Sequence, residues 1–501
     1  MTAQAFWIML AKTVAFGFTF ALPLLLVRRL SQTDYGLYKQ IFLLVGTAFA
    51  LLPLGVGMSA YYFLPREPER RPQIVLNILL FHLLVSALFL AAVVLRPQLL
   101  ASLFNSPEME GYAPLVGLVV MTWITSSLLE IFTIARQEVR LATLLVILSQ
   151  LTKAALMFGA VLLFGTVRSL LYAALVQGAL QTLILLVYLR ARYGSFWRDF
   201  DPALWRTQLA YALPFGAASM LYRSQAELDN YFVSHRFGPA VYGVYANGCF
   251  EVPLLGLLAE SISSVTIPRV SYLQKEGARR EIAELVARVM RKLALILFPL
   301  YFLLLVVGRE FITFLFTEQY AESWPIFAFN LTLIPLLLIT SAYDPVMRAY
   351  AEHRYFLLKL RCVLLVLMVT GLFFATARFG LLGAIAVNIA VNLIDRAVVA
   401  LKVKRILGLG RRDLPLFRDI WRIVAAAAAA GGVTLWTARV ALAGARPFTV
   451  LAAGGVVFMV VYVAGVLALK VLTPEEREAV RRRIPFGSRA GRGKQAADQL
   501  V

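Results

Sequence analysis

A few charged side chains lie inside long apolar segments of this sequence and are its best candidates for chemistry. Lys153 lies in the middle of segment 141–164, and Ser149 and Gln150 share its face of a helix at i−4 and i−3. An ionised group at the centre of a bilayer costs roughly 2.5–3.5 kcal/mol on insertion scales, so it requires a partner or a wet cavity. Because an ammonium group binds phosphate as a point charge, we expect Lys153 to bind an anionic cargo. The alternative is an internal ion pair with Glu130.

A second polar group lies in the seventh apolar segment. Arg223, Glu227 and Asn230 follow one another at i, i+4 and i+7 and form one stripe on a helix. This stripe either lines a cavity or reflects simple neutralisation of Arg223 by Glu227. Asp229 points roughly 120° away from Arg223 at 100° per residue. It is a candidate for binding a coupling ion or for pairing with Arg236.

Other polar residues in the apolar segments are weaker candidates. Glu251 and Glu260 lie on opposite faces of a helix, so at most one faces a cavity, and Glu251 is retained. Asp344 precedes Pro345, which predicts a broken or kinked helix there. One further stripe predicts hydrogen bonds between helices; it consists of Asn388, Asn392 and Asp395.

The composition shows that the chain is a membrane protein. Apolar residues make up 60% of the 501 residues and charged residues only 15%, whereas soluble chains carry about 25% charged residues. These values exclude a soluble enzyme, a secreted disulfide scaffold and a disordered protein. The net charge of +21 therefore does not indicate a nucleic-acid partner. Cys249 and Cys362 lie in apolar segments, which predicts neither a disulfide framework nor a metal site.

The apolar segments predict an all-α polytopic protein with about fourteen transmembrane helices, since a spanning helix needs roughly 20 apolar residues. The expected spans are 6–27, 36–64, 74–95, 113–135, 141–164, 168–189, 207–235, 240–268, 293–316, 324–347, 354–377, 380–401, 420–442 and 447–469.

The distribution of Lys and Arg predicts the orientation of the spans. The connections on the side of both termini hold about four times as many Lys and Arg as the opposite connections, and basic connections face the cytoplasm. We therefore expect both termini in the cytoplasm and count Lys39 among the few outward basic residues. Segment 275–292 predicts an amphipathic helix at the cytoplasmic interface. The basic tail, 471–501, is expected to contact membrane lipids.

An internal repeat divides the chain. The pattern R-x5-Y-G-x-Y occurs at 29–38 and again at 236–245, each time between a helix and its successor. This predicts two pseudo-symmetric six-helix bundles, 1–195 and 200–401. A cytoplasmic loop and an extra helix pair follow at 402–470. Parallel repeats of this kind are a recurring transporter architecture.

Basic residues near the first span and at the repeated hairpin form a third group of candidates. Lys12 is close enough to the cytoplasmic end of its span to reach the surface by snorkelling, and it is also a candidate cargo residue. Arg28 and Arg29 lie at the outer end, against the positive-inside trend, and Arg29 recurs as Arg236. These arginines either guide an anionic cargo outward or cap helix carbonyls at the hairpins.

Short motifs follow one another in a fixed order along the chain. They are Arg29-Leu30, Asp34–Tyr38, Leu54–Gly57, Asp229, Arg236 and Tyr242–Tyr245. In order and spacing they resemble the polysaccharide-exporter, or oligosaccharide flippase, branch of the multidrug/oligosaccharidyl-lipid/polysaccharide exporter superfamily, over nearly the whole chain. One departure is Ser31-Gln32 in the first hairpin, where the family usually has Gly-Pro; the second hairpin has Gly238-Pro239.

The resemblance implies a protein of the bacterial inner membrane that moves undecaprenyl-diphosphate-linked oligosaccharide across it by alternating access, for polysaccharide biosynthesis. Lys12, Lys153 and Arg223 would hold the diphosphate, and the polysaccharide polymerase machinery is a candidate partner. Because no bond is made or broken, neither a catalytic residue nor a cofactor is expected. A gradient of H+ or Na+ would supply the energy, since the chain has no G-x-x-x-x-G-K-[ST] loop for ATP.

Three alternatives remain open. A lipid II flippase or an ion-coupled multidrug exporter would share the fold, and a drug exporter would line its cavity with carboxylates and aromatic residues. The basic residues inside the spans favour an anionic cargo over a cationic drug. A membrane glycosyltransferase is less favoured because the outward connections are short and the chain has only 3 histidines.

Overall fold

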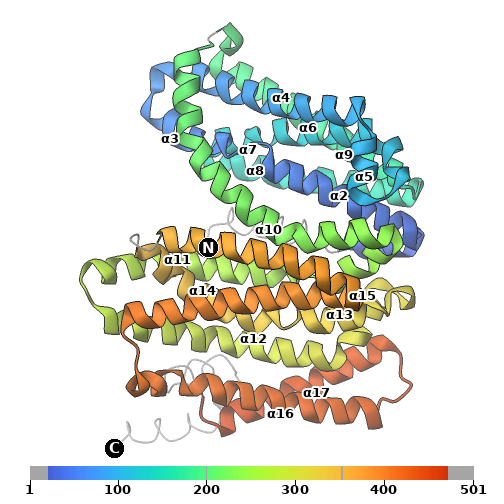
Figure 1. The fold of residues 1–501 in the computed structure, drawn as a ribbon, viewed down its shortest axis with the longest axis vertical. Coiled ribbons are helices and arrows are strands. Elements are labelled where there is room, and N and C mark those ends of the chain that lie inside the picture. The colour runs from blue at the N-terminus through green and yellow to red at the C-terminus, as the bar shows by residue number, and fades with distance from the viewer. Residues whose placement is uncertain (1–20, 199, 351–353, 472–501) are drawn as a thin grey trace, which may run out of the picture. The chain divides into compact units, whose positions relative to one another are not determined.

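The computed structural model describes residues 21–198, 200–350 and 354–471 (Figure 1). Every regular element in these ranges is a helix, which confirms the all-α class. Lys12, most of the first expected span and residues 472–501 of the tail lie outside the described residues. The described helices fall into two compact units. The first comprises Met1–Glu251, Ile312–Asn330 and Glu352–Asp395, and the second comprises Val252–Phe311, Leu331–Ala351 and Arg396–Val501.

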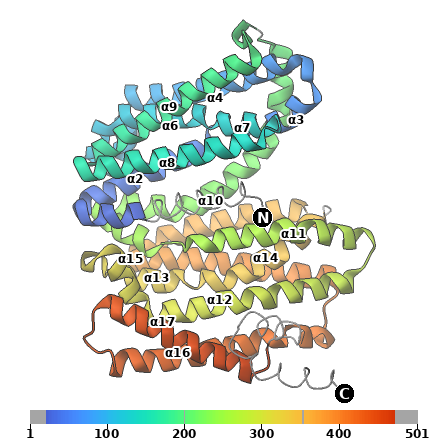
Figure 2. The same ribbon diagram turned by 180° about the vertical axis from the view of Figure 1, so that it is seen from behind.

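The first unit holds most of the N-terminal helices. In it α4, α6, α8 and α9 pack side by side, and α10 packs along α2 (Figure 2). The helices are α2 (Gln32–Leu51), α3 (Ser59–Arg66), α4 (Arg71–Leu95), α5 (Gln98–Phe104), α6 (Ala113–Ser126), α7 (Leu128–Ala135), α8 (Val139–Leu163), α9 (Val167–Tyr193), α10 (Pro202–Gly248), α13 (Ser323–Asn330), the end of α12 (Arg279–Phe316) and most of α15 (Arg354–Leu407), with the 3-10 turns η1 (Val56–Met58), η2 (Pro68–Arg70), η3 (Pro107–Tyr112), η4 (Phe196–Arg198) and η5 (Glu318–Tyr320).

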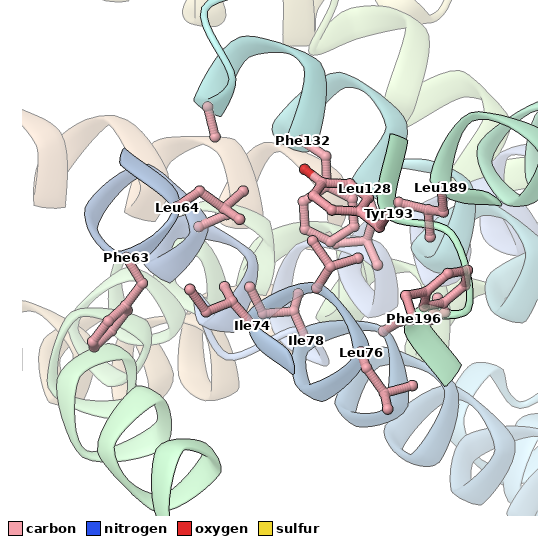
Figure 3. Packing of buried hydrophobic residues seen from close by; sticks show 14 of the residues in the cluster. Phe63, Leu64, Ile74, Leu76, Ile78, Leu128, Phe132, Leu189, Tyr193 and Phe196 are labelled. Carbon is pink, nitrogen blue, oxygen red and sulfur yellow. The ribbon is translucent and has the colours of Figure 1, made fainter. Parts of the chain in front are cut away.

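A cluster of buried apolar side chains holds the ends of several helices of the first unit together (Figure 3). Phe63 and Leu64 of α3 pack with Ile74 and Ile78 of α4, and Phe132 of α7 joins them. All of these side chains are at most 5% exposed, so the cluster fixes the short α3 against its neighbours.

The second unit contains α11 (Pro253–Lys275), α14 (Leu333–Ala349), most of α12, and the C-terminal pair α16 (Arg418–Val440) and α17 (Pro447–Ala468), preceded by η7 (Arg411–Phe417). The last two helices form a hairpin. The hydroxyl of Tyr462 in α17 donates to the carbonyl of Leu295 in α12 at 3.0 Å. Gly465 allows close approach of the hairpin helices, because a Cβ there would lie 3.2 Å from that of Ala426.

Most expected spans coincide with observed helices, but two of them are interrupted. The second span bends by 43° between Gln32–Leu51 and Val56–Arg66, through Gly55 with a φ of 70°. Glycine adopts this left-handed conformation without steric cost. The eighth span is divided after Gly248, where α10 ends, and resumes at Pro253 in α11.

The described helices include nine that are long and apolar enough to cross a membrane, or ten if the bent pair counts as one span. The expected number of about fourteen therefore stays a prediction. The helices α10 and α11, which correspond to spans seven and eight, are absent from the nine because they are too polar. The helix α15 joins spans eleven and twelve through a non-helical residue at Gly380.

Candidate functional site

The two copies of the Y-G-x-Y motif contact each other directly. A Cβ on Gly36 would overlap the backbone carbonyl of Pro239, and one on Gly243 would lie 3.4 Å from the Cα of Gly36. The Tyr35 hydroxyl, fully buried, donates to Oδ1 of Asn247 at 2.6 Å. The two glycines therefore let the start of α2 and the end of α10 approach at backbone distance.

The two hairpins begin their helices differently. Ser31, which stands where the family usually has glycine, is the N-cap of α2, and its Oγ accepts from the backbone N–H of Asp34 at 3.0 Å. The second hairpin uses Gly238, whose non-helical backbone with a φ of 76° marks a kink within α10, and Pro239 follows directly after it. A serine N-cap thus starts α2 at the place where the pattern has Gly-Pro.

Asp229 is a deeply buried candidate carboxylate, at 2% exposed. Its Oδ2 accepts from the Tyr245 hydroxyl at 2.7 Å and from Nδ2 of Asn388 at 2.6 Å. Its Oδ1 is buried and has no hydrogen-bond partner among the described residues. The expected pair with Arg236 is not formed, since Arg236 is exposed. Two neutral donors hold this carboxylate, and no cation of the described chain neutralises it.

The stripe on α10 forms a chain of polar contacts. Nη2 of Arg223 lies 3.6 Å from Oε1 of Glu227, and Nδ2 of Asn230 donates to Oε2 of Glu227 at 3.2 Å. The Tyr242 hydroxyl reaches Oδ1 of Asn230 at 3.5 Å. Glu227 thus neutralises Arg223, as one of the two interpretations expected, although Arg223 remains half exposed.

Two members of the stripe on α15 make contacts outside their own span, since Asn388 contacts α10 and Asp395 contacts the arm of α15 before Gly380. Asn388 makes the bond to Asp229, and Asn392 donates to Oδ1 of Asn388 at 2.8 Å. Nη2 of Arg361 lies 3.3 Å from Oδ2 of Asp395, whose side chain is 2% exposed. The guanidinium of Arg361 also lies 5.4 Å from the ring centroid of Tyr222.

Lys153 is held by an aromatic ring and not by a carboxylate. Its Nζ lies 4.1 Å from the ring centroid of Trp123, and the indole N–H of Trp123 donates to the carbonyl of Ala174 at 3.0 Å. Beside it, Gln181 donates to the hydroxyl of Ser149. The alternative pair with Glu130 is absent, because Glu130 is exposed and Lys153 makes no ion pair with any described residue.

Lys39 is a cation that sequence reasoning assigned to the wrong place. It was expected in an outward connection, but it lies within α2, partly buried, with Nζ 5.4 Å from the ring centroid of Tyr35. The assignment was inconsistent with the expected span 36–64, which already includes residue 39, and α2 begins still earlier, at Gln32 after the Ser31 cap. Lys39, like Lys153, makes no ion pair with a described residue.

The arginines at the hairpins divide into two kinds. Arg28 donates to the carbonyls of Phe314 at 2.8 Å and Leu315 at 3.0 Å, so it caps the end of α12 and the capping interpretation holds for it. Arg29 and Arg236 are exposed and make no side-chain bond within the described residues. Of the three hairpin arginines, Arg29 and Arg236 thus remain candidates for outer cations.

Two acidic candidates lie at the ends of helices or beside a proline. Glu251 is exposed just beyond the end of α10, and its place in a cavity stays a prediction. Of the broken or kinked helix predicted at Asp344 and Pro345, the break is not present, because α14 runs from Leu333 to Ala349. Proline removes a single backbone donor, and the rest of this short helix keeps its bonds. No group of three His, Cys, Asp or Glu in the described ranges could hold a metal ion.

The described residues form an all-helical, multi-pass fold with charged groups inside its long helices, an architecture found among membrane transporters. The chain is a member of the polysaccharide biosynthesis protein family, whose model matches residues 25–325. Comparison with curated proteins gives no match.

Solved structures share the fold. The lipid II flippase MurJ, in an inward closed conformation, superimposes with a TM-score of 0.74 at 14% identity over 92% of this chain and 98% of its own. An inward-facing multidrug resistance MATE family transporter of the MOP superfamily gives 0.59 at 15% identity, covering 77% and 94%. A MOP superfamily transporter from Pyrococcus furiosus gives 0.55 at 17% identity, covering 80% and 94%. The chain therefore has the MurJ/MATE-like fold.

Proposed function

We propose that the protein is a flippase that moves undecaprenyl-diphosphate-linked oligosaccharide across the bacterial inner membrane for polysaccharide biosynthesis. One observation carries the choice of an anionic, phosphate-bearing cargo. Lys39 and Lys153 lie inside membrane helices, and each contacts an aromatic ring while no described carboxylate pairs with it. A cation left in this state can exchange a weak ring contact for a charge-assisted bond to phosphate.

The other candidate residues receive roles that fit this cargo. Lys12 and Arg223 would join Lys153 around the diphosphate, and Arg29 and Arg236 would attract it on the outer side. The bundles 1–195 and 200–401 would alternate between inward- and outward-open states, with both termini cytoplasmic. Membrane lipids surround the protein, and the polysaccharide polymerase machinery would receive the product.

Asp229 is the proposed coupling site, with Glu227 and Glu251 as neighbouring acidic groups. Its buried Oδ1 has no described donor, so a proton or Na+ would complete its bonding. Because burial without a counter-charge is costly, ion binding and the state of α10 would be linked.

The deciding experiment uses a strain that lacks the gene and any redundant flippase. We expect lipid-linked oligosaccharide to accumulate in the cytoplasmic leaflet and surface polysaccharide to be lost, and the wild-type gene to restore both. The double variant Lys153→Ala, Arg223→Ala, expressed at the normal level, should restore export poorly. Normal export in the deletion strain would overturn the function, and full rescue by the double variant would overturn the cationic site.

A lipid II flippase is the second candidate, because the MurJ fold covers 92% of the chain. Vesicles that contain the purified protein separate the two. Transfer of undecaprenyl-diphosphate oligosaccharide without a peptide, faster than transfer of lipid II, supports the leading function. The reverse preference supports the second.

A further inference from the structure

Trp123 and Lys153 form a pair whose geometry is specific. The ammonium lies 4.1 Å from the indole centroid, and the indole itself is anchored by its N–H bond to the carbonyl of Ala174 in α9. Both side chains are partly accessible. The ring is therefore fixed, whereas the ammonium sits at the end of a flexible four-carbon stem and is free to move.

The ring contact is a weak way to hold a charge within a membrane helix. A cation over an aromatic face is attracted only by the ring quadrupole, while a phosphate oxygen offers a full opposite charge and a hydrogen bond. No described carboxylate pairs with Lys153. An incoming phosphate would thus draw the ammonium off the ring, and the indole face would become vacant.

Further rings extend from Trp123. The ring centroid of Phe42 lies 6.1 Å from that of Trp123, and the centroid of Tyr38 lies 4.7 Å from that of Phe42. These rings are partly buried, unlike outward-facing rings such as those of Phe374 at 70% and Trp436 at 65% exposed. The row of rings continues from Tyr38 to Tyr35, and the ammonium of Lys39 lies over the Tyr35 ring. Each terminal ring of the row, Trp123 at one end and Tyr35 at the other, thus contacts an ammonium group.

This combination suits a sugar attached to phosphate. Aromatic faces carry partial negative charge, and the C–H bonds on one face of a pyranose ring are polarised positively, so sugars stack on such rings. We propose that Trp123 and Lys153 form a subsite for the first, phosphate-linked sugar of the cargo. Trp123 holds the ammonium in the empty protein, and after the ammonium has moved to phosphate its indole face receives the sugar ring. This inference rests on the proposed function and assigns a specificity residue within it.

Binding of two probes to the full-length protein in lipid nanodiscs tests the subsite. The probes are undecaprenyl diphosphate and undecaprenyl-diphospho-N-acetylglucosamine. We expect the wild type to bind the sugar-bearing probe about tenfold more tightly. Trp123→Leu should reduce this ratio to near one, and Lys153→Met should weaken binding of both probes about tenfold. Trp436→Leu, which removes an exposed indole elsewhere, is the matched control and should leave both affinities unchanged.

Tryptophan fluorescence gives a second measurement that does not require removal of the ring's bulk. Either probe should change the emission of the wild type, and the change should be smaller in Trp123→Phe and in Lys153→Met. An unchanged ratio in Trp123→Leu, or an unchanged signal in Trp123→Phe, in a protein that still transports its cargo would overturn the subsite and leave the function intact. If the wild type binds neither probe, the proposed function itself fails, and the subsite with it.

Discussion

At the scale of single residues, the notable feature is a set of charges that no ion pair with another described residue neutralises. Asp229 is held by the hydroxyl of Tyr245 and the amide of Asn388, and both are neutral. Lys153 and Lys39 are held by rings. By contrast, Arg361 and Asp395 neutralise each other. Because isolated charges are costly in a membrane, we expect a ligand of opposite charge to bind these unneutralised groups.

Asp229→Asn separates the charge of this carboxylate from its shape. The amide keeps the size and can still accept from Tyr245, so the helix contacts should persist. Loss of the charge should remove ion coupling. Because coupling typically changes an equilibrium 5–150-fold, we expect an imposed H+ or Na+ gradient to lose an acceleration of about tenfold. Initial rates of cargo transfer in vesicles, with and without each gradient, measure this. Glu108→Gln, at an exposed carboxylate in η3, should keep the gradient effect; equal loss in both variants would contradict the assignment.

The spacing of residues predicted part of this site. The i, i+4, i+7 stripe of Asn388, Asn392 and Asp395 pointed to contacts between helices, and the structure shows them. The partner was not predictable, because Asp229 and Asn388 are 159 positions apart and no local pattern links them. Of the two alternatives left open for Asp229, the pair with Arg236 is not formed in the structure, and the coupling-ion site stays a prediction.

At the scale of elements, the repeated hairpins show why a motif can have a packing role. The glycines of the two Y-G-x-Y motifs meet where α2 and α10 approach at backbone distance. Sequence patterns located both hairpins, but they did not show that the hairpins touch. For segment 275–292, the sequence predicted the helix but not its surroundings. Its helical period was recognised correctly, yet residues from 279 onward form the start of the continuous α12, and Ile282, Val286 and Met290 are buried in the second unit.

Gly36→Ala tests the hairpin contact. The added Cβ would overlap the carbonyl of Pro239, which belongs to the backbone and cannot rotate away. We expect a loss of about 1–3 kcal/mol, the usual cost of overpacking. Gly46→Ala is a matched control in the same helix, because nothing lies within 4 Å of its Cβ position. There, removal of a flexible glycine should stabilise α2 by up to about 1 kcal/mol. Thermal unfolding in detergent should therefore shift in opposite directions, and a shift in the same direction would contradict the contact.

The start of α10 offers a test by pH. Asp201 caps this helix, with Oδ1 accepting from the N–H groups of Ala203 at 2.9 Å and Leu204 at 3.0 Å, and its other oxygen pairs with Arg70. The backbone bond from Leu204 and the bond from Arg70 lower the pKa of Asp201. Its contribution to stability is thus present above the unfolded pKa of about 3.9 and is lost as the pH falls through the lower folded value.

Asp201→Asn keeps a good cap residue and removes the charge. The variant should unfold at a lower temperature than the wild type near neutral pH. The two unfolding temperatures should converge as the pH falls from about 4 through the lowered folded pKa of Asp201, below which the wild-type carboxyl is also neutral. Thermal unfolding of both proteins from pH 3 to pH 7 measures the difference. A difference that stays constant over this range would show that the cap geometry, and not the charge of Asp201, is responsible.

At the scale of the whole molecule, the helices that carry the candidate site differ in how closely they resemble membrane spans. Lys153 lies on α8, one of the nine apolar helices found in the described residues, whereas α10, with Arg223, Glu227 and Asp229, is outside that group. Polar spans of this kind are stable where protein or a wet cavity covers their charges. Hydropathy alone therefore finds the helix of Lys153 but not the helix of Asp229.

The orientation of the whole molecule follows from its basic connections and is open to direct measurement. We expect the turn between α16 and α17 to face outward and the segment before α16 to face the cytoplasm. In a background with Cys249→Ala and Cys362→Ala, Ala443→Cys should react with a membrane-impermeant maleimide in intact cells. Leu414→Cys, at a side chain that is 65% exposed, should react only after the membrane is opened. The reverse pattern would place Arg29 and Arg236 on the cytoplasmic side, where they would meet cargo on entry and not on release, and the direction of the proposed transport would have to be reassigned with them.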